Sequence, residues 1–505
     1  MQREPARILT RSPHEQELFA NACPAGWMNP TPRGPYRLLV IGAGPAGLAA
    51  ARDAAGRGAS VALIERQLLG GNCVNFGCIP SKALLRTSRL VAEMRSAENF
   101  GALAPEDAVV DFATAMARVR RIRARLSRVD SARRLAALGI DVYFGGARFT
   151  GPDSVDVAGK RLSFKRALIA TGSRSMLPTI PGLSEAGFLT NETVFDLDER
   201  PRSLLVIGGG PLGCELAQAF SRLGTRTLIA HSEPLFLPKE ERDAAQMVSD
   251  ALARDGVEIH LNTEVVAVSL QGGLKRVELL GNGNRATTTV DAILTGIGRV
   301  PAVQALDLDA AGVDFDAEVG VRVDDFLRTS NPRIYAAGDV CLEHRYTNTA
   351  EASARIVVHN ALLRGRRRMS ALTIPWCTYT DPEIAHVGIY VRQARQRGIP
   401  VKTYTVPMHE VDRAVADGEE DGFVKIHVRE GSDRILGATI VARHAGEMIN
   451  GISLAMMAGI GLATLSESIH AYPTQAEGIR QAADACVRSL HSPLRAWLVR
   501  RWLRR

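Results

Sequence analysis

The sequence lacks a long hydrophobic run, an apolar leader and cysteines at metal-binding spacing. The uncharged stretch from Gly451 to Ser466 is too short and too rich in glycine to span a bilayer. Charged residues are spread through the first 35 positions, so no signal peptide is expected there. The seven cysteines show no repeated spacing and no CxxC pair, which is typical of a reducing compartment and gives no metal site. We therefore expect a cytoplasmic protein.

Length and composition indicate a globular protein of several domains. A chain of 505 residues, 46% hydrophobic and 23% charged, is large enough for about three cores. The net charge of +8 does not predict nucleic-acid binding, because much of the excess is arginine in two clusters. In the first cluster, Arg118 to Arg134, apolar residues recur at helical spacing. We expect a helix there with one packed face and one solvated cationic face.

The stretch from Gly70 to Lys82 holds two cysteines, Cys73 and Cys78, among glycines. Pro80 ends the predicted loop, and Ser81 opens an amphipathic helix. A thiol near a helix N-terminus is shifted toward its thiolate, and two such thiols can close and reopen a disulfide by exchange. A purely structural disulfide in so short a loop would add only about 2 kcal/mol, and two unrelated buried thiols are the other interpretation. Redox chemistry is the hypothesis we favour.

A dinucleotide-binding motif precedes this stretch. A buried-type strand from Arg37 to Ile41 runs into a glycine-rich turn and an alanine-rich helix, and a second strand from Ser60 to Ile64 ends at an acid. The glycines let the backbone approach a pyrophosphate at the helix N-terminus, and the acid accepts hydrogen bonds from ribose hydroxyls. The complete pattern predicts a bound dinucleotide held by Gly42, Gly44, Pro45, Ala46, Gly47 and Glu65.

A second motif of the same kind follows the strand from Leu204 to Ile207, which indicates a second dinucleotide and an internal duplication. The next strand, Thr225 to Ile229, is not followed by the acid that binds the ribose of NAD. A carboxylate there would repel a 2′-phosphate, so its absence favours NADPH over NADH, with Arg242 as a more distant phosphate ligand. The residues predicted to hold this nucleotide are Gly208, Gly210, Pro211, Leu212, Gly213, His231 and Ser232.

The string GGNCVNFGCIPSK, from Gly70 to Lys82, resembles the active-site segment of the class I pyridine nucleotide–disulfide oxidoreductases, and further motifs extend the resemblance from Tyr36 to Ala485. It implies an α/β fold with two Rossmann-like dinucleotide-binding domains, the second inserted in the first, and a C-terminal α+β dimerisation domain. The expected parts are an irregular N-terminal arm (1–35), an FAD-binding domain (36–190 and 302–370), an NAD(P)-binding domain (191–301), the dimerisation domain (371–490) and a basic tail (491–505).

The same resemblance assigns roles to individual residues. Cys78 is expected next to the flavin and Cys73 at the electron acceptor, while Lys82, paired with Glu215, is expected beside flavin N5. The local sequence of Lys82 alone would also suit a solvated surface lysine. Further cofactor contacts are implied for Gly71, Asn72, Lys82, Ala147, Thr171, Gly172, Val265, Gly298, Asp339 and Thr347.

One position departs from the thiol–disulfide members of that family. They carry a histidine just before a C-terminal proline, where it acts as a base because its pKa lies near the operating pH. This chain has Tyr472 there, with Glu477 retained, and a phenol is a poor base at neutral pH. His470, two residues away, is the alternative base. In a homodimer, this segment is expected to complete the active site of the other subunit.

Mercuric reductases also carry tyrosine at the comparable place, but they deliver Hg(II) through two adjacent cysteines near the C-terminus. After Ala485 this chain holds only Cys486, and soft Hg(II) needs thiolate ligands. We therefore predict an enzyme that passes electrons from NADPH, or from NADH, through FAD to a disulfide or another small acceptor. The alternatives are a mercuric reductase, a dihydrolipoamide dehydrogenase, and a non-catalytic flavoprotein that binds a partner or a membrane through its basic tail.

Overall fold

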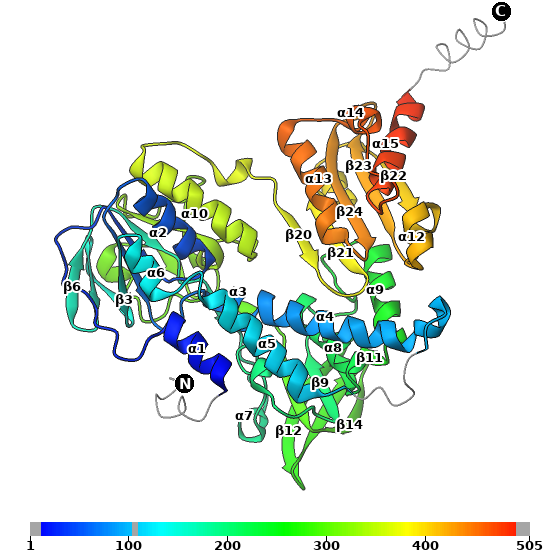
Figure 1. The fold of residues 1–505 in the computed structure, drawn as a ribbon, viewed down its shortest axis with the longest axis horizontal. Helices are drawn as coiled ribbons and strands as arrows, with labels where there is room; N and C mark the ends of the chain where they lie inside the picture. Colours follow the sequence, from blue (N-terminus) through cyan, green and yellow to red (C-terminus); the bar gives the residue numbers. More distant parts are fainter. Residues whose placement is uncertain (1–11, 104–109, 491–505) are drawn as a thin grey trace, which may run out of the picture.

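The computed structural model describes residues 12–103 and 110–490, which form three main sheets with helices packed around them (Figure 1). The expected basic tail, 491–505, and residues 1–11 of the expected arm lie outside the described residues. Within the two described ranges, no helix is both long enough and apolar enough to cross a membrane.

The first main sheet is parallel, with the strand order β19 (Ile334–Ala336), β7 (Ala167–Ile169), β1 (Leu38–Ile41), β2 (Val61–Glu65) and β3 (Ile140–Phe144). Its central strands are buried along their whole length because both faces of the sheet are covered. One face packs on the helices α2 (Pro45–Gly56) and α10 (Thr347–Leu362). The other face packs on the antiparallel strands β4 (Ala147–Gly151), β5 (Ser154–Val157) and β6 (Lys160–Ser163).

The second main sheet repeats this plan, with the parallel order β11 (Val257–His260), β10 (Arg226–Ala230), β9 (Ser203–Ile207) and β15 (Ala292–Thr295). It is covered by the helices α8 (Pro211–Arg222) and α9 (Arg242–Arg254) and by the antiparallel strands β12 (Thr263–Gln271), β13 (Leu274–Gly281) and β14 (Asn284–Val290). The chain enters and leaves this unit through a two-stranded ladder, β8 (Ser173–Ser175) with β16 (Arg299–Pro301). The second unit is therefore inserted into the first.

The third main sheet is antiparallel, with the order β20 (Pro375–Thr378), β21 (Glu383–Gly388), β24 (Ile435–Ala442), β23 (Phe423–Arg429) and β22 (Val401–Pro407). The helices α13 (Ala445–Ala458) and α15 (Glu477–Leu490) bury their apolar faces against it. Shorter elements complete the described chain: α7 (Leu183–Ala186), α11 (Val391–Gln396), α12 (Asp412–Asp417), α14 (Leu462–Glu467), β17 (Phe315–Asp316), β18 (Gly320–Val321), and the 3-10 helices η2 (Ala97–Phe100), η3 (Val194–Asp196), η4 (Asp309–Ala311), η5 (Gly338–Val340), η6 (Met369–Ala371) and η7 (Met408–Glu410).

The cysteine stretch is helical, so the predicted loop before Ser81 is wrong. A short helix, α3 (Gly71–Phe76), is followed directly by the long helix α4 (Cys78–Arg95). Gly77 separates the two helices. Pro80 lies in the first turn of α4, where a backbone N–H has no helical partner and its absence costs no hydrogen bond. Pro80 therefore belongs to the helix and does not end a loop before it.

The first arginine cluster forms two helices, α5 (Phe112–Ser127) and α6 (Ala132–Ala137), instead of one. The prediction of a fully solvated cationic face is also wrong, because Arg120 and Arg123 are only 8% and 2% exposed. Arg120 Nη2 lies 2.7 Å from the carboxylate of Asp198, and Arg123 Nη1 lies 3.9 Å from that of Asp196. Burial is tolerated here because acids on the neighbouring segment compensate both charges.

The expected irregular arm contains a helix, α1 (Pro13–Ala22), so that part of the prediction is wrong. Ser12 and Glu15 form a capping box at its start, and proline at the first helical position favours the same conformation. Leu18 is buried in the core of the first unit. The arm is fixed further along by Trp27, whose Nε1–H donates to the carbonyl of Val142 at 3.0 Å.

Candidate functional site

The two cysteines of the GGNCVNFGCIPSK stretch lie at adjoining helix ends. Cys73 belongs to α3 and Cys78 is the first residue of α4. The start of α3 packs tightly on the first glycine-rich turn: a Cβ added to Gly71, which has a φ of +60°, would lie 2.6 Å from the Cα of Gly44. Only glycine permits this approach, so the sequence places the cysteines directly against the first dinucleotide motif.

The surroundings of the two thiols favour a thiolate on Cys78. Both cysteines are free thiols in the structure. The hydrogen bond from Cys73 lowers the pKa of Cys78 to about 6, with further contributions from the Thr347 hydroxyl, 3.5 Å from Sγ, and the Lys82 ammonium; burial opposes the shift. The same hydrogen bond, together with burial, raises the pKa of Cys73. These contacts therefore favour the thiolate on Cys78 over one on Cys73.

The N-termini of α4 and α10 meet at the sulfur of Cys78. Cys78 begins α4, and Thr347 begins α10, whose N-terminal end carries no side-chain cap. The positive ends of both helix dipoles stabilise a negative charge between them. Cys78 and Thr347 are 269 positions apart in the chain, so only the fold brings them together.

Lys82 lies one turn after Cys78 and forms an ion pair with the second dinucleotide unit. Its Nζ is 2.7 Å from Oε2 of Glu215, which is 3% exposed. The other carboxylate oxygen accepts the backbone N–H of Tyr379 at 2.9 Å, and the Lys82 ammonium lies 4.4 Å from the centre of the Tyr379 ring. Burial would lower the pKa of Lys82, but Glu215 more than offsets it, and that pKa is raised above its ordinary value. Lys82 is therefore not a solvated surface lysine.

Tyr379 is a site residue that the sequence did not predict. It comes from the third unit, yet its backbone and ring contact the Lys82–Glu215 pair. The signal available in the sequence was the WCTYTDPE string that opens the third unit, but that string gave no reason to connect it with Lys82.

The two glycine-rich turns have closely similar geometry, as an internal duplication requires. Gly42 and Gly208 both have a φ of +100°, and an added Cβ would lie 2.4 Å and 2.7 Å from the carbonyl oxygens of Ala170 and Gly296. The helices that follow, α2 and α8, begin at proline and have no side-chain cap on their first N–H groups. Uncapped N–H groups at a glycine-lined helix start fit a dinucleotide pyrophosphate. Pro45, Ala46, Gly47, Pro211, Leu212 and Gly213 form the first turns of these helices.

The strand ends beyond these turns differ in charge. In the first unit, the buried carboxylate of Glu65 accepts the N–H of Ala43 at 2.8 Å and that of Gln67 at 2.8 Å. In the second unit, Nδ1 of His231 accepts the N–H of Gly209 at 3.2 Å, so the imidazole takes the place of the carboxylate. With Nδ1 as acceptor, a neutral ring carries its proton on Nε2. Ser232 is exposed beside it.

Arg242, the more distant phosphate ligand suggested by the sequence, is used elsewhere. Its guanidinium donates to the carbonyl oxygens of Phe236, Leu237 and Glu240 at 2.9, 2.6 and 2.9 Å. These bonds close the loop that leads into α9 and use three of the five guanidinium N–H donors, so they disfavour Arg242 as a phosphate ligand.

A polar group around Asp339 joins the first unit to the crossing ladder. Its Oδ2 accepts the Ser173 hydroxyl at 2.6 Å, and Arg299 Nε donates to the same hydroxyl oxygen at 2.7 Å. Nearby in the chain, in the first turn of α10, the hydroxyl of Thr349 is buried and has no partner among the described residues. Buried hydroxyls normally find partners, so this one fits a polar ligand such as the expected FAD.

The remaining predicted cofactor residues fall into two groups. One group forms hydrogen bonds near the β8–β16 ladder, and the other is packed in apolar cores. Asn72 Nδ2 donates to the carbonyl of Ser173 at 2.7 Å, and Thr171 and Gly172 bond the backbone of Ala302. Gly298, which has a φ of +118°, accepts the N–H of Met176 in the same crossing segment. By contrast, the side chains of Ala147 and Val265 are packed in apolar cores.

Tyr472, His470 and Glu477 do not contact the cysteines within one chain. Figure 1 shows α15, which begins at Glu477, well separated from α3. Tyr472 is 69% exposed and donates to Oδ2 of Asp412 at 2.8 Å, while Glu477 accepts from Arg480 at 2.6 Å. Glu477 therefore does not hold the side chain of Tyr472, as it would hold the histidine of the thiol–disulfide enzymes. Within a single chain, the site lacks these residues.

Comparisons with known families cover nearly the whole described chain. The family described as "Pyridine nucleotide-disulphide oxidoreductase" matches residues 36–355, and its dimerisation domain matches residues 374–483. Among sequence relatives, the mercuric reductase of Lysinibacillus sphaericus is 35% identical over 449 residues, covering 89% of this chain and 82% of that protein. The dihydrolipoyl dehydrogenase of Chlamydia muridarum is 34% identical over 468 residues, covering 91% and 98%.

Solved structures give the same result. The HOCl-induced flavoprotein disulfide reductase RclA from Escherichia coli superposes with a TM-score of 0.80 at 30% identity, covering 89% of this chain and 99% of RclA. LpdA from Mycobacterium tuberculosis superposes with a TM-score of 0.82 at 27% identity, covering 90% and 100%. These matches place the cysteine stretch and both glycine-rich turns within the matched region.

Proposed function

The chain belongs to the pyridine nucleotide-disulphide oxidoreductase family, and on that premise we propose that it reduces a small disulfide at the expense of NADPH. The predicted α/β fold and the predicted FAD-dependent oxidoreductase class are confirmed by the family and its relatives. The dimerisation domain indicates a homodimer. The electron acceptor, the choice of NADPH and the roles of single residues are our proposals.

The observation that carries the proposal is the pair of thiols, Cys73 on α3 and Cys78 at the start of α4, with Thr347 beside Cys78 and the Lys82–Glu215 pair one turn away. FAD, when bound, supplies the two-electron chemistry that links the nicotinamide to this pair. The uncapped start of α2, the buried Glu65 and the unpaired Thr349 hydroxyl would hold it. Lys82, kept charged by Glu215, provides a fixed positive charge beside Cys78.

We assign the exchange chemistry to the two sulfurs. Cys73 attacks one sulfur of the acceptor disulfide; a Cys73–acceptor bond forms, the acceptor S–S bond breaks, and the proton of Cys73 passes to the first leaving thiolate. The Cys78 thiolate then attacks the sulfur of Cys73. This restores the Cys73–Cys78 disulfide and releases the second acceptor thiolate, which takes a proton from solvent. The low pKa of Cys78 keeps it ready for this second attack.

We assign Tyr472 a supporting role in this exchange. In a homodimer with shared active sites, the C-terminal segment of one subunit reaches the cysteines of the other. In this role the Tyr472 hydroxyl exchanges its hydrogen bond to Asp412 for one to the departing thiolate, and it does not act as a base because a phenol stays protonated at neutral pH. His470, whose Nδ1 lies 3.2 Å from the Ser468 carbonyl, is the alternative proton carrier, and Glu477 is committed to Arg480.

NADPH is the proposed electron donor because neither of the two residues directly after β10 is an acid; the first carboxylate is that of Glu233. His231 occupies the position next to Gly209, and the exposed Ser232 can donate to a 2′-phosphate. An acid at either position would repel that phosphate. A cytoplasmic location, expected from the cysteine pattern, stays a prediction.

A mercuric reductase is the second candidate, because several relatives at 32–35% identity carry that name. Against it, Cys486 is fully buried in α15 and cannot act as an exposed delivery thiol. The deciding experiment measures NADPH oxidation by the purified flavoprotein with a panel of small disulfides and with Hg(II) in excess thiol. Stimulation by a disulfide and not by Hg(II) supports the proposal, and the reverse result assigns the protein to metal-ion reduction.

A further inference from the structure

The turn between β20 and β21 is wedged against one face of α8. Glu215, Gln218 and Arg222 recur on that face at intervals of three and four residues, so they point the same way. Each one binds the turn: Glu215 accepts the N–H of Tyr379 at 2.9 Å, and Arg222 Nη1 donates to the Asp381 carboxylate at 2.8 Å. The third unit, which is built on the antiparallel sheet, is therefore attached to α8. This helix also carries Glu215, the partner of Lys82.

Gln218 forms the centre of this attachment. Its side-chain oxygen accepts the N–H of Asp381 at 2.8 Å, and its amide N–H donates to the carbonyl of Asp381 at 2.8 Å. Gln218 is fully buried, so both bonds are shielded from water. Two hydrogen bonds between one side-chain amide and one backbone residue fix the position of the turn along the axis of α8. They also fix the distance between the turn and the helix.

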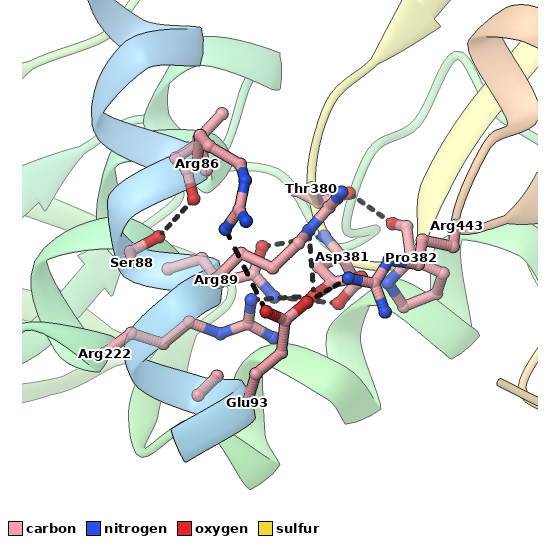
Figure 2. A network of polar contacts seen from close by, with 12 residues as sticks. Arg86, Ser88, Arg89, Glu93, Arg222, Thr380, Asp381, Pro382 and Arg443 are labelled. Carbon is pink, nitrogen blue, oxygen red and sulfur yellow. Dashed lines mark hydrogen bonds and ion pairs between the residues drawn. The ribbon is translucent and has the colours of Figure 1, made fainter. Parts of the chain in front are cut away.

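The side chain of Asp381 connects α8 to α4. Figure 2 shows it among Arg89 of α4, Arg222 of α8 and Arg443, which follows β24. Arg89 Nε lies 3.5 Å from the carboxylate, and Arg222 also binds Asp255 at 2.9 Å. Burial raises the pKa of Asp381, but the arginines more than offset it, so the pKa is lowered and the carboxylate stays charged.

A second set of ion pairs in the same network connects α4 to the third unit. Arg443 binds Glu93, near the end of α4, and also Glu419, which precedes β23. Arg86 lies 3.9 Å from Glu93 on the same helix (Figure 2). The helix that begins at Cys78 is therefore held along its length by charges from the third unit.

We propose that Asp381 is a positioning residue: held by Gln218, Arg222 and Arg89, it seats the turn so that the Tyr379 N–H orients Glu215 toward Lys82. Lys82 and Arg89 lie on the same side of α4, about 10 Å apart along its axis. Asp381 binds Arg89 on α4 and Arg222 on α8, and so fixes the two helices relative to each other about two turns beyond the point where Lys82 meets Glu215. The relevance to turnover rests on the proposed role of the Lys82–Glu215 pair.

The pKa of Lys82 reports this positioning. The groups that act on its ammonium are Glu215 on α8, Cys78 on its own helix, and Cys377 on β20, with the Tyr379 ring alongside. Glu215 makes the only direct ion pair of Lys82 within the described residues. If the turn is released, Glu215 loses the Tyr379 N–H and its fixed orientation. The burial of Lys82 then dominates and its pKa falls.

The experiment measures the pKa of Lys82 in the flavin-bound protein by trace labelling with acetic anhydride across pH, followed by mass spectrometry of the Lys82 peptide. Asp381→Asn and Gln218→Met are the test variants; Gln218→Met keeps every charge in the network. Glu93→Gln is the matched control, since it removes a carboxylate from the same ion-pair network on α4 without touching the turn or Gln218. Glu215→Gln removes the partner of Lys82 outright and sets the size of the full effect.

Both test variants should lower the pKa of Lys82 by about one unit, which is about tenfold more labelling at a fixed pH below the pKa, while Glu93→Gln leaves it unchanged. Equal titration curves for Asp381→Asn, Gln218→Met and Glu93→Gln would overturn the proposal. Should Asp381→Asn fail to fold, Gln218→Met decides alone. If Glu215→Gln lowers the pKa of Lys82 without slowing NADPH-dependent turnover, the proposed role of the pair fails while the positioning role stands.

Discussion

Replacing Thr347 with valine tests the electrostatics on which the proposed chemistry depends. The substitution keeps the shape of the side chain and removes the hydroxyl that lies 3.5 Å from Cys78 Sγ. A hydrogen bond to a charged acceptor contributes about 1.5–3 kcal/mol, and one pKa unit corresponds to about 1.4 kcal/mol. The contact is long and Cys78 is partly exposed, so solvent screens it and we expect the pKa of Cys78 to rise by about 0.5–1 unit.

The rise follows from the starting pKa of about 6. At pH 6, the thiolate fraction of Cys78 should fall from about one half to between about one quarter and one tenth, which slows alkylation by iodoacetamide about two- to fivefold. At pH 9 both proteins should react at the same rate, because the thiol is ionised in each. The assay follows the alkylated Cys78 in the anaerobically reduced protein by fragment mass spectrometry.

Thr87→Val is the matched control. It also replaces a threonine with valine, but the hydroxyl that it removes from α4 is hydrogen-bonded to Ala83 and Arg118. Its alkylation profile should equal that of the unmodified protein. An unchanged profile in Thr347→Val, or a slowing that is equally large at pH 9, would refute the contribution of this contact to the low pKa of Cys78.

Three further predictions concern the sulfurs, the nucleotide and the backbone. Cys78→Ser should abolish the long-wavelength thiolate-to-flavin absorbance of the anaerobically reduced protein, whereas Cys73→Ser should retain it; both should lose disulfide reduction. Ser232→Asp should lower kcat/KM for NADPH about tenfold through repulsion of the 2′-phosphate and change that for NADH less than threefold. Gly71→Ala should cost about 2 kcal/mol or more in urea unfolding and reduce bound flavin at 450 nm, because the new Cβ meets Gly44 at a left-handed φ.

Local patterns predicted the local structures well. The strand, glycine turn and helix of each nucleotide motif lie where periodicity and glycine spacing put them, because these features depend on neighbours in the chain. The failures have local causes too. The start of α1 was missed although Ser12 and Glu15 form a capping box, and Pro80 was read as the end of a loop although it lies in the first turn of α4.

Contacts between distant segments could not be derived from pattern. Lys82 and Glu215 are 133 positions apart, and Glu215 and Tyr379 are 164 apart. The first contact was expected from family resemblance and the second was not expected at all. The burial of Arg120 and Arg123 was missed for the same reason, since Asp198 and Asp196 come from a segment far along the chain. A charge pattern along one helix carries no information about which acids the fold brings to it.

The near-identity of the two glycine turns has an evolutionary consequence. Since the two turns present the same backbone geometry, the difference between the two units lies at the strand termini, where Glu65 accepts from Ala43 and His231 accepts from Gly209. A lineage of this protein could exchange one reductant for another by altering two or three side chains after Ala230, leaving the duplicated scaffold, and everything folded upon it, untouched.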